Sequence, residues 1–172
     1  MKRTIALFTA FVAVLTLSLN GFAAEPDKPG TKFITIQAGG LPGYGGILSG
    51  NIAMANLGAT HLYGGLQLGA DYRNGSHASS IDLSLAPRLM LGVNVGKVVE
   101  LHIGGFAGVG LRKFNPDDHG MDFLYSLGGF GGLRLNLSDS LAIVAEGCYA
   151  PHMARLPFST LPYVMAGLAF RL

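Results

Sequence analysis

The sequence has no tryptophan, a single cysteine and few charged residues. Charged side chains make up 13% of the 172 residues, about half of the share that is usual in soluble domains. The mean hydropathy of +0.41 is correspondingly apolar. With Cys148 as the one cysteine, a scaffold held together by intramolecular disulfide bonds is excluded.

Long apolar runs are also absent after residue 24. A membrane-spanning helix needs a stretch of about 18 or more apolar residues, and none exists there. An apolar chain without such a helix can satisfy its backbone polar groups in lipid only as a closed β-barrel. The composition therefore favours a β-barrel membrane protein.

The N-terminus resembles a secretory signal peptide, assigned to residues 1–23. Lys2 and Arg3 precede an apolar stretch at 5–19, and small residues follow. Cleavage after Ala23 is preferred to cleavage after Ala24, because it places Gly21 rather than a bulky residue at the −3 position; an uncleaved anchor is the alternative. Removing this leader takes two of the twelve basic residues and leaves ten against ten acidic ones. That balance does not indicate a nucleic-acid partner.

Residues 24–31 are polar and rich in proline, and we expect a tether there. Beyond it, apolar residues recur at every second position, as from Ile81 to Val95, which predicts strands and excludes helices. We predict an all-β, eight-stranded antiparallel up-and-down transmembrane barrel over 32–172. The predicted strands are 32–40, 46–56, 61–73, 80–95, 98–112, 121–137, 140–150 and 161–172. Pro87 should cause a bulge or a bend in the fourth, because it lacks an amide donor.

The two faces of these strands predict which side meets lipid. The aliphatic face is unbroken, whereas the other face consists mostly of small residues with a few charges. Small residues suit the crowded interior of an eight-stranded barrel, so the aliphatic face should point to lipid. A soluble lipocalin-like barrel, with the polar face outward, is the alternative. Short connections at 56–60, 96–97 and 138–139 should lie at the periplasmic end, and generally longer ones at the outer end.

Aromatic residues provide a second indication of the membrane boundary. Tyr72, Phe123, Tyr125 and Tyr149 fall on the aliphatic face near strand ends that should share the outer rim. Outer-membrane barrels carry a girdle of aromatic residues at such a boundary. We therefore interpret these four as an aromatic girdle.

The last ten residues resemble the insertion signal that ends bacterial outer-membrane barrels, in which alternate residues are apolar. The matching residues are Val164, Ala166, Leu168, Phe170 and Leu172. With the leader and the eight strands, the mature chain resembles the family of small eight-stranded outer-membrane barrels of the outer membrane protein X and outer membrane protein A type. This resemblance implies recognition by the barrel-assembly machinery. We expect a monomer located in the cell outer membrane, with membrane lipids as partners. The resemblance implies no shared activity.

Charged residues on the inward face are the first candidates for a functional site. Buried charges are costly unless they are paired, so we predict a lumen network that plugs the barrel. Its predicted members are Arg88, Glu100, His102, Arg134 and Glu146. A gated proton or ion path through them is the alternative.

Catalytic and metal-binding patterns are weak. His77-Ala78-Ser79 resembles the His-x-Ser of outer-membrane lipid A deacylases, but the one nearby carboxylate, Asp82, faces the lumen. The acidic segment at 115–122 lacks the spacing of a calcium loop, and the histidines lack zinc spacing. We therefore expect a non-enzymatic protein without a cofactor, with a structural or interaction role. A narrow channel or hydrophobic-ligand carrier is the alternative, and a lipid-modifying enzyme has less support.

Overall fold

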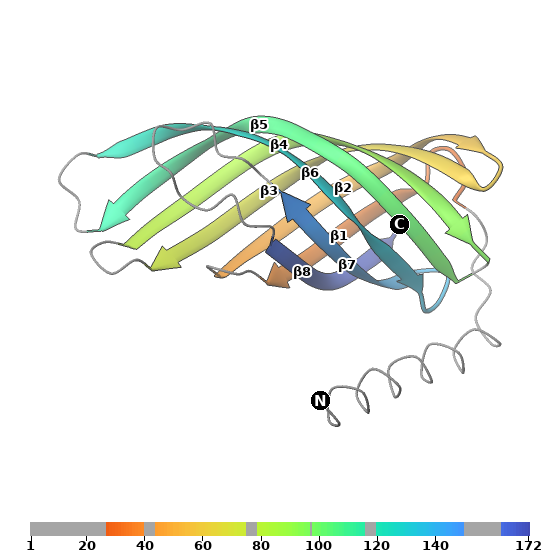
Figure 1. Cartoon of the computed structure of the whole chain (residues 1–172). Helices are drawn as coiled ribbons and strands as arrows, with labels where there is room; N and C mark the ends of the chain where they lie inside the picture. The colour runs from red at the N-terminus through yellow and green to blue at the C-terminus, as the bar shows by residue number, and fades with distance from the viewer. Residues whose placement is uncertain (1–26, 40–43, 75–78, 97, 116–119, 150–162) are drawn as a thin grey trace, which may run out of the picture.

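The computed structural model describes residues 27–39, 44–74, 79–96, 98–115, 120–149 and 163–172. These residues form eight antiparallel strands that close into a barrel (Figure 1). The strands are β1 (Lys32–Gly39), β2 (Tyr44–Leu57), β3 (Thr60–Asn74), β4 (Ser79–Val95), β5 (Val99–Asn115), β6 (Met121–Asn136), β7 (Leu141–Tyr149) and β8 (Tyr163–Arg171). Each predicted strand is confirmed, with ends that agree to within three residues. None of the described residues lies in a helix that is long and apolar enough to cross a membrane.

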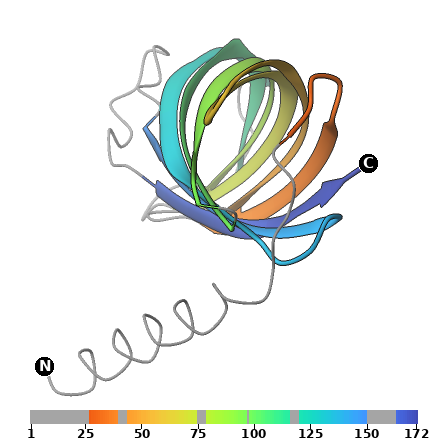
Figure 2. The ribbon, with the colours of Figure 1, turned by 90° about the vertical axis from the view of Figure 1, so that its right-hand side faces the viewer.

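The barrel closes where the first strand meets the last. β1 pairs with β8 from Phe33 opposite Arg171 to Gly39 opposite Met165. The amide of Leu172 donates to the carbonyl of Lys32 at 2.9 Å, which extends the closure to the chain end. The view in Figure 2 shows the resulting ring of strands. Because β1 and β8 pair with each other, neither strand is left with an unpaired edge.

Side chains alternate between the two sides of the wall, as the sequence predicts. In β4, Leu83 and Leu89 are 54% and 55% exposed on the outside, whereas the inward Arg88 is 4% exposed. The other strands repeat this pattern, so the outside of the barrel is a belt of leucine, isoleucine and valine. An apolar surface of this extent requires a nonaqueous surrounding or a partner. The soluble lipocalin-like alternative, with its polar face outward, is therefore wrong.

Short turns join the strands at the end of the barrel where β1 begins and β8 ends. Two of them contain glycine with positive φ, Gly58 at 77° and Gly96 at 75°. This conformation is open to glycine at no steric cost, which permits the chain to reverse within a few residues. The third reversal, between β6 and β7, is stabilised by the Ser138 hydroxyl, which accepts from the Leu141 amide at 3.1 Å.

Of the bulge or bend predicted at Pro87, the bulge is wrong, and the bend stays a prediction. β4 keeps one register past it, from Leu85 opposite Val109 to Arg88 opposite Phe106, although the two intervening positions drop out of the ladder to β5. On its other side Pro87 remains paired with Leu66 of β3. The missing amide therefore interrupts one ladder locally without adding a residue. The register shift of this wall lies elsewhere, between Ala53 and Ala55 of β2.

Candidate functional site: the barrel lumen

The lumen holds all five of the predicted network residues. Arg88, Glu100, His102, Arg134 and Glu146 point inward and are at most 7% exposed. They come from β4, β5, β6 and β7, which lie side by side (Figure 1). The burial of their side chains places them in the lumen. The structure divides them between two groups, which we call the Glu146 cluster and the Asp27 cluster.

The Glu146 cluster consists of Arg88, His102 and Glu146. Arg88 Nη2 lies 2.9 Å from Glu146 Oε1, and His102 Nε2 lies 3.1 Å from the same oxygen. The Arg88 guanidinium also lies 4.0 Å from the centre of the Phe130 ring. One carboxylate thus compensates a buried arginine, which an aromatic face stabilises further.

The Asp27 cluster consists of Asp27, Tyr63, Glu100, Arg134 and Arg171. Arg134 Nη2 donates to Glu100 Oε2 at 2.9 Å and also contacts Asp27 Oδ2. The Tyr63 hydroxyl lies 2.5 Å from Glu100 Oε2 and 2.6 Å from Asp27 Oδ2. Its single proton can be donated to only one of these carboxylates at a time. The hydroxyl therefore joins two acidic groups that would otherwise repel each other.

The predicted network omits three members of this cluster, Asp27, Tyr63 and Arg171, and Asp27 is the one that lies outside the strands. The sequence places it in a polar tether, yet its side chain is only 3% exposed and inserts into the lumen. Its Oδ1 accepts from Arg171 Nη2 at 2.5 Å, and its carbonyl accepts from Asn56 Nδ2 at 3.1 Å. Counting lumen charges could have revealed it, because Arg171 also faces inward and the predicted network offers it no carboxylate.

A small cavity separates the two clusters. Its volume is about 20 Å³, and its wall includes Asn51, Val144 and residues of both clusters. Five polar atoms of wall residues have no hydrogen-bond partner among the described residues: Asn51 Oδ1, Arg88 Nε, Glu100 Oε1, His102 Nδ1 and Arg134 Nε. The volume and the donors and acceptors suit a single water molecule. A molecule larger than water does not fit at this level of the lumen.

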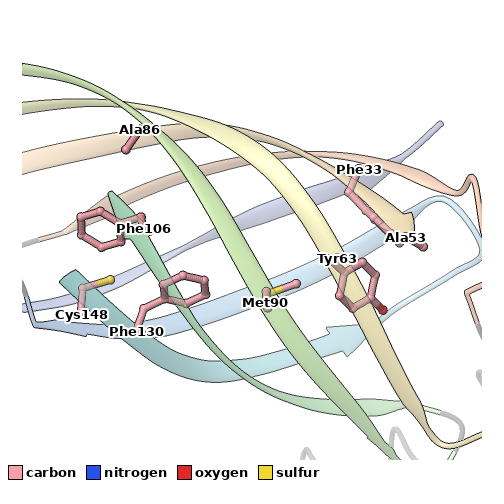
Figure 3. Close-up of a cluster of buried hydrophobic side chains, with 8 residues drawn as sticks. All are labelled: Phe33, Ala53, Tyr63, Ala86, Met90, Phe106, Phe130 and Cys148. Atoms are coloured by element: carbon pink, nitrogen blue, oxygen red, sulfur yellow. The ribbon is translucent and has the colours of Figure 1, made fainter. Parts of the chain in front are cut away.

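Farther along the lumen, polar and apolar layers alternate. Next to the Glu146 cluster the rings of Phe106 and Phe130 stack with centroids 6.5 Å apart, within the buried group drawn in Figure 3. Beyond them Arg112 binds Asp82 through two hydrogen bonds, Nε to Oδ1 at 2.7 Å and Nη2 to Oδ2 at 2.6 Å. Side chains therefore fill the lumen at several successive levels.

Glycines on the inward face create the space that these side chains occupy. A Cβ atom at Gly92 would lie 2.7 Å from the carboxyl carbon of Glu100. A Cβ atom at Gly104 would lie 2.4 Å from Phe130 Cζ, and one at Gly128 would lie 2.6 Å from Phe106 Cζ. The high glycine content thus serves lumen packing, since larger residues at these positions would collide with the plug.

Comparisons of sequence identify no relatives: no protein-family model matches the chain, and no curated protein matches it. Solved structures do match. The attachment invasion locus protein Ail of Yersinia pestis superposes with a TM-score of 0.56 at 16% identity, covering 84% of this chain and 100% of Ail. The fold is that of the small outer-membrane β-barrels.

Two further structures of this fold match similarly. A de novo designed transmembrane β-barrel gives a TM-score of 0.55 at 15% identity, covering 86% of this chain and 100% of the design. Neisserial surface protein A gives 0.53 at 9% identity, covering 83% of this chain and 94% of its own. At such identities the likeness concerns the fold alone.

The four predicted girdle residues all lie on the outside of this outer-membrane-type barrel, between 42% and 63% exposed. Phe123 and Tyr125 contact each other edge to face, with centroids 5.4 Å apart. Tyr72 pairs across β2 and β3 with Tyr44, an exposed tyrosine that sequence reasoning does not include. Tyr149 lies opposite Gly129, four residues along β6 from Tyr125, and the role of the four residues as a membrane girdle stays a prediction.

The predicted assembly signal occupies the outward face of the closing strand. Val164, Ala166, Leu168, Phe170 and Leu172 are all exposed there. Their inward neighbours Met165 and Ala169 are buried. The alternation matches the expected pattern, and recognition by the assembly machinery stays a prediction.

The segments considered for catalysis and calcium binding lie only in part within the residues that the structure describes. His77 and Ala78 lie outside the described residues, and Ser79 begins β4. Residues 116–119 also lie outside it. Within the described ranges, no three histidine, cysteine, aspartate or glutamate side chains gather as a metal site would require.

Proposed function

We propose that this chain is a monomeric, integral protein of the outer membrane with a closed lumen. It acts through its outer surface, in a structural or interaction role, and neither transports solutes nor catalyses a reaction. Outer-membrane lipids are its immediate partners, and the barrel-assembly machinery inserts it. The single observation that carries this proposal is the combination of a continuous apolar exterior with an interior of interlocked ion pairs.

The apolar exterior supports the membrane location. Among the described residues, leucine, isoleucine or valine side chains are exposed on every strand, and charges lie on the inward face or near strand ends. Lipid is the environment in which such a belt is stable, and a closed barrel leaves few backbone groups unsatisfied there.

The filled interior supports a role other than the transport of solutes. Arg88, Glu146 and the stacked phenylalanines cross the lumen in consecutive layers, and the cavity beside them admits only water. A narrow channel is the second candidate, and the polar cavity atoms without a partner favour it. Conductance distinguishes the two.

The purified protein in planar lipid bilayers is expected to give no discrete current steps at moderate voltages, because the paired charges obstruct the lumen. The measurement is single-channel recording. A general porin, recorded separately in a bilayer of the same composition, is the positive control. Reproducible steps from the wild-type protein, at levels that scale with salt concentration, would establish the channel instead.

The folded protein is also expected to be heat-modifiable. Unboiled samples should migrate differently from boiled samples on a detergent gel, because a closed barrel offers no strand edge from which the detergent can begin unfolding. Fractionation of the cell envelope is the companion measurement. Identical migration together with recovery from the soluble periplasmic fraction contradicts the membrane assignment.

A further inference from the structure

The end of the barrel that carries the short turns contains a binding site for a carboxylate group. Arg134, Arg171 and Tyr63 reach it from β6, β8 and β3, and all three contact the same carboxylate. Arg134 is 4% exposed and Tyr63 is fully buried. Two guanidinium groups and a phenol that converge on two oxygen atoms are a strong receptor for an anion of this shape.

The carboxylate comes from outside the strands. Asp27 precedes β1, and the next three residues of the chain, Lys28 to Gly30, are exposed on the surface. The segment follows the barrel mouth, where the Gly30 amide donates to the Ala53 carbonyl at 2.8 Å. One side chain of a surface segment thus inserts into a site that the barrel wall has already built.

Charge balance shows why this site requires an anion. The barrel wall contributes two positive charges, Arg134 and Arg171, and one negative charge, Glu100. Without a further anion Glu100 compensates only one guanidinium, and the partly buried Arg171 is left without a carboxylate, which is unfavourable. Asp27 completes the balance, and the Phe33 ring, 4.3 Å from the Arg134 guanidinium, cannot replace a charge.

We propose that Arg134, Arg171 and Tyr63 form a carboxylate-binding site and that Asp27 is a ligand supplied in cis. The N-terminal segment then acts as a tethered occupant, which has a high effective concentration at the site because the chain holds it there. A small free carboxylate binds the same groups when Asp27 has no carboxylate of its own. The inference goes beyond the proposed function and does not depend on it.

Chemical rescue tests this site. Asp27→Ala deletes the carboxylate and little else, so formate supplies almost the atoms that are missing. The refolded variant should have a lower urea midpoint than the wild type in sodium chloride. Sodium formate at the same ionic strength should restore at least half of that loss, with a saturable concentration dependence. If the variant does not refold in chloride, the yield of heat-modifiable barrel with and without formate is the readout.

Three controls make the outcome decisive. Wild type should not respond to formate, because Asp27 occupies the site. Asp27→Asn should not respond either, since the amide fills the space that formate needs. Asp139→Ala removes an exposed aspartate from a turn at the same end and should behave like wild type. Undiminished stability of Asp27→Ala, or a loss that formate and chloride affect equally, overturns the proposal.

Discussion

Glu146→Ala is expected to destabilise the barrel by about 3–5 kcal/mol, since its removal leaves the buried Arg88 guanidinium without a carboxylate. The side chains of both residues are at most 4% exposed, so water compensates little of the loss. His102 loses its partner oxygen in the same step. Urea unfolding in phospholipid vesicles measures the change in the free energy of unfolding.

A double-mutant cycle separates the ion pair from general damage to the lumen. Arg88→Ala combined with Glu146→Ala should cost at least about 1 kcal/mol less than the sum of the single variants. Arg112→Ala is the matched control, because Arg112 is an equally buried lumen arginine that pairs with Asp82. Its effect should add to that of Glu146→Ala. Additivity in both cycles would remove the support for the Glu146 cluster.

Leu89→Arg is expected to cost about 2–4 kcal/mol, because Leu89 is 55% exposed on the apolar belt near the middle of β4. An arginine there must place its charge in the hydrocarbon or deform the lipid around it. The free energy of unfolding in vesicles again provides the measurement.

Val95→Arg is the control for that substitution. Val95 is 53% exposed on the same face of the same strand, directly before the turn at Gly96. At the membrane boundary the same change should cost about 0–1 kcal/mol. Equal costs at the two positions would contradict the placement of the belt in lipid, whereas a soluble barrel would tolerate both.

The strands and the direction of their side chains could be predicted because both follow from local alternation. A period of two identifies a strand and assigns each residue to a face, and no distant contact is needed for either. The inward direction of Arg88 and Glu146 is predicted correctly for this reason. Their direct contact depends on how far neighbouring strands are offset around the ring, which alternation does not specify.

Features that depend on closure of the barrel could not be predicted from the sequence. Asp27 lies outside the strands, and its environment exists only once β3, β6 and β8 meet at one end of the barrel. The prediction of a bulge at Pro87 was wrong for a related reason. Pairing with β3 and β5 fixes the register of β4 from both sides. The missing amide of Pro87 therefore leaves a gap in one hydrogen-bond ladder, whereas in an isolated hairpin it could have shifted the register.

The glycine slots of the lumen have a consequence for how this protein can evolve. The carboxyl group of Glu100 occupies the volume that a side chain at position 92 would fill, and the three nearest atoms all belong to that flexible side chain. The same holds for Gly69 and the hydroxyl of Ser84. A substitution at either residue of such a pair changes how large the side chain at the other position can be. Among descendants of this chain, positions 92 and 100 should therefore vary together, as should 69 and 84, while the lipid-facing leucines between them change independently.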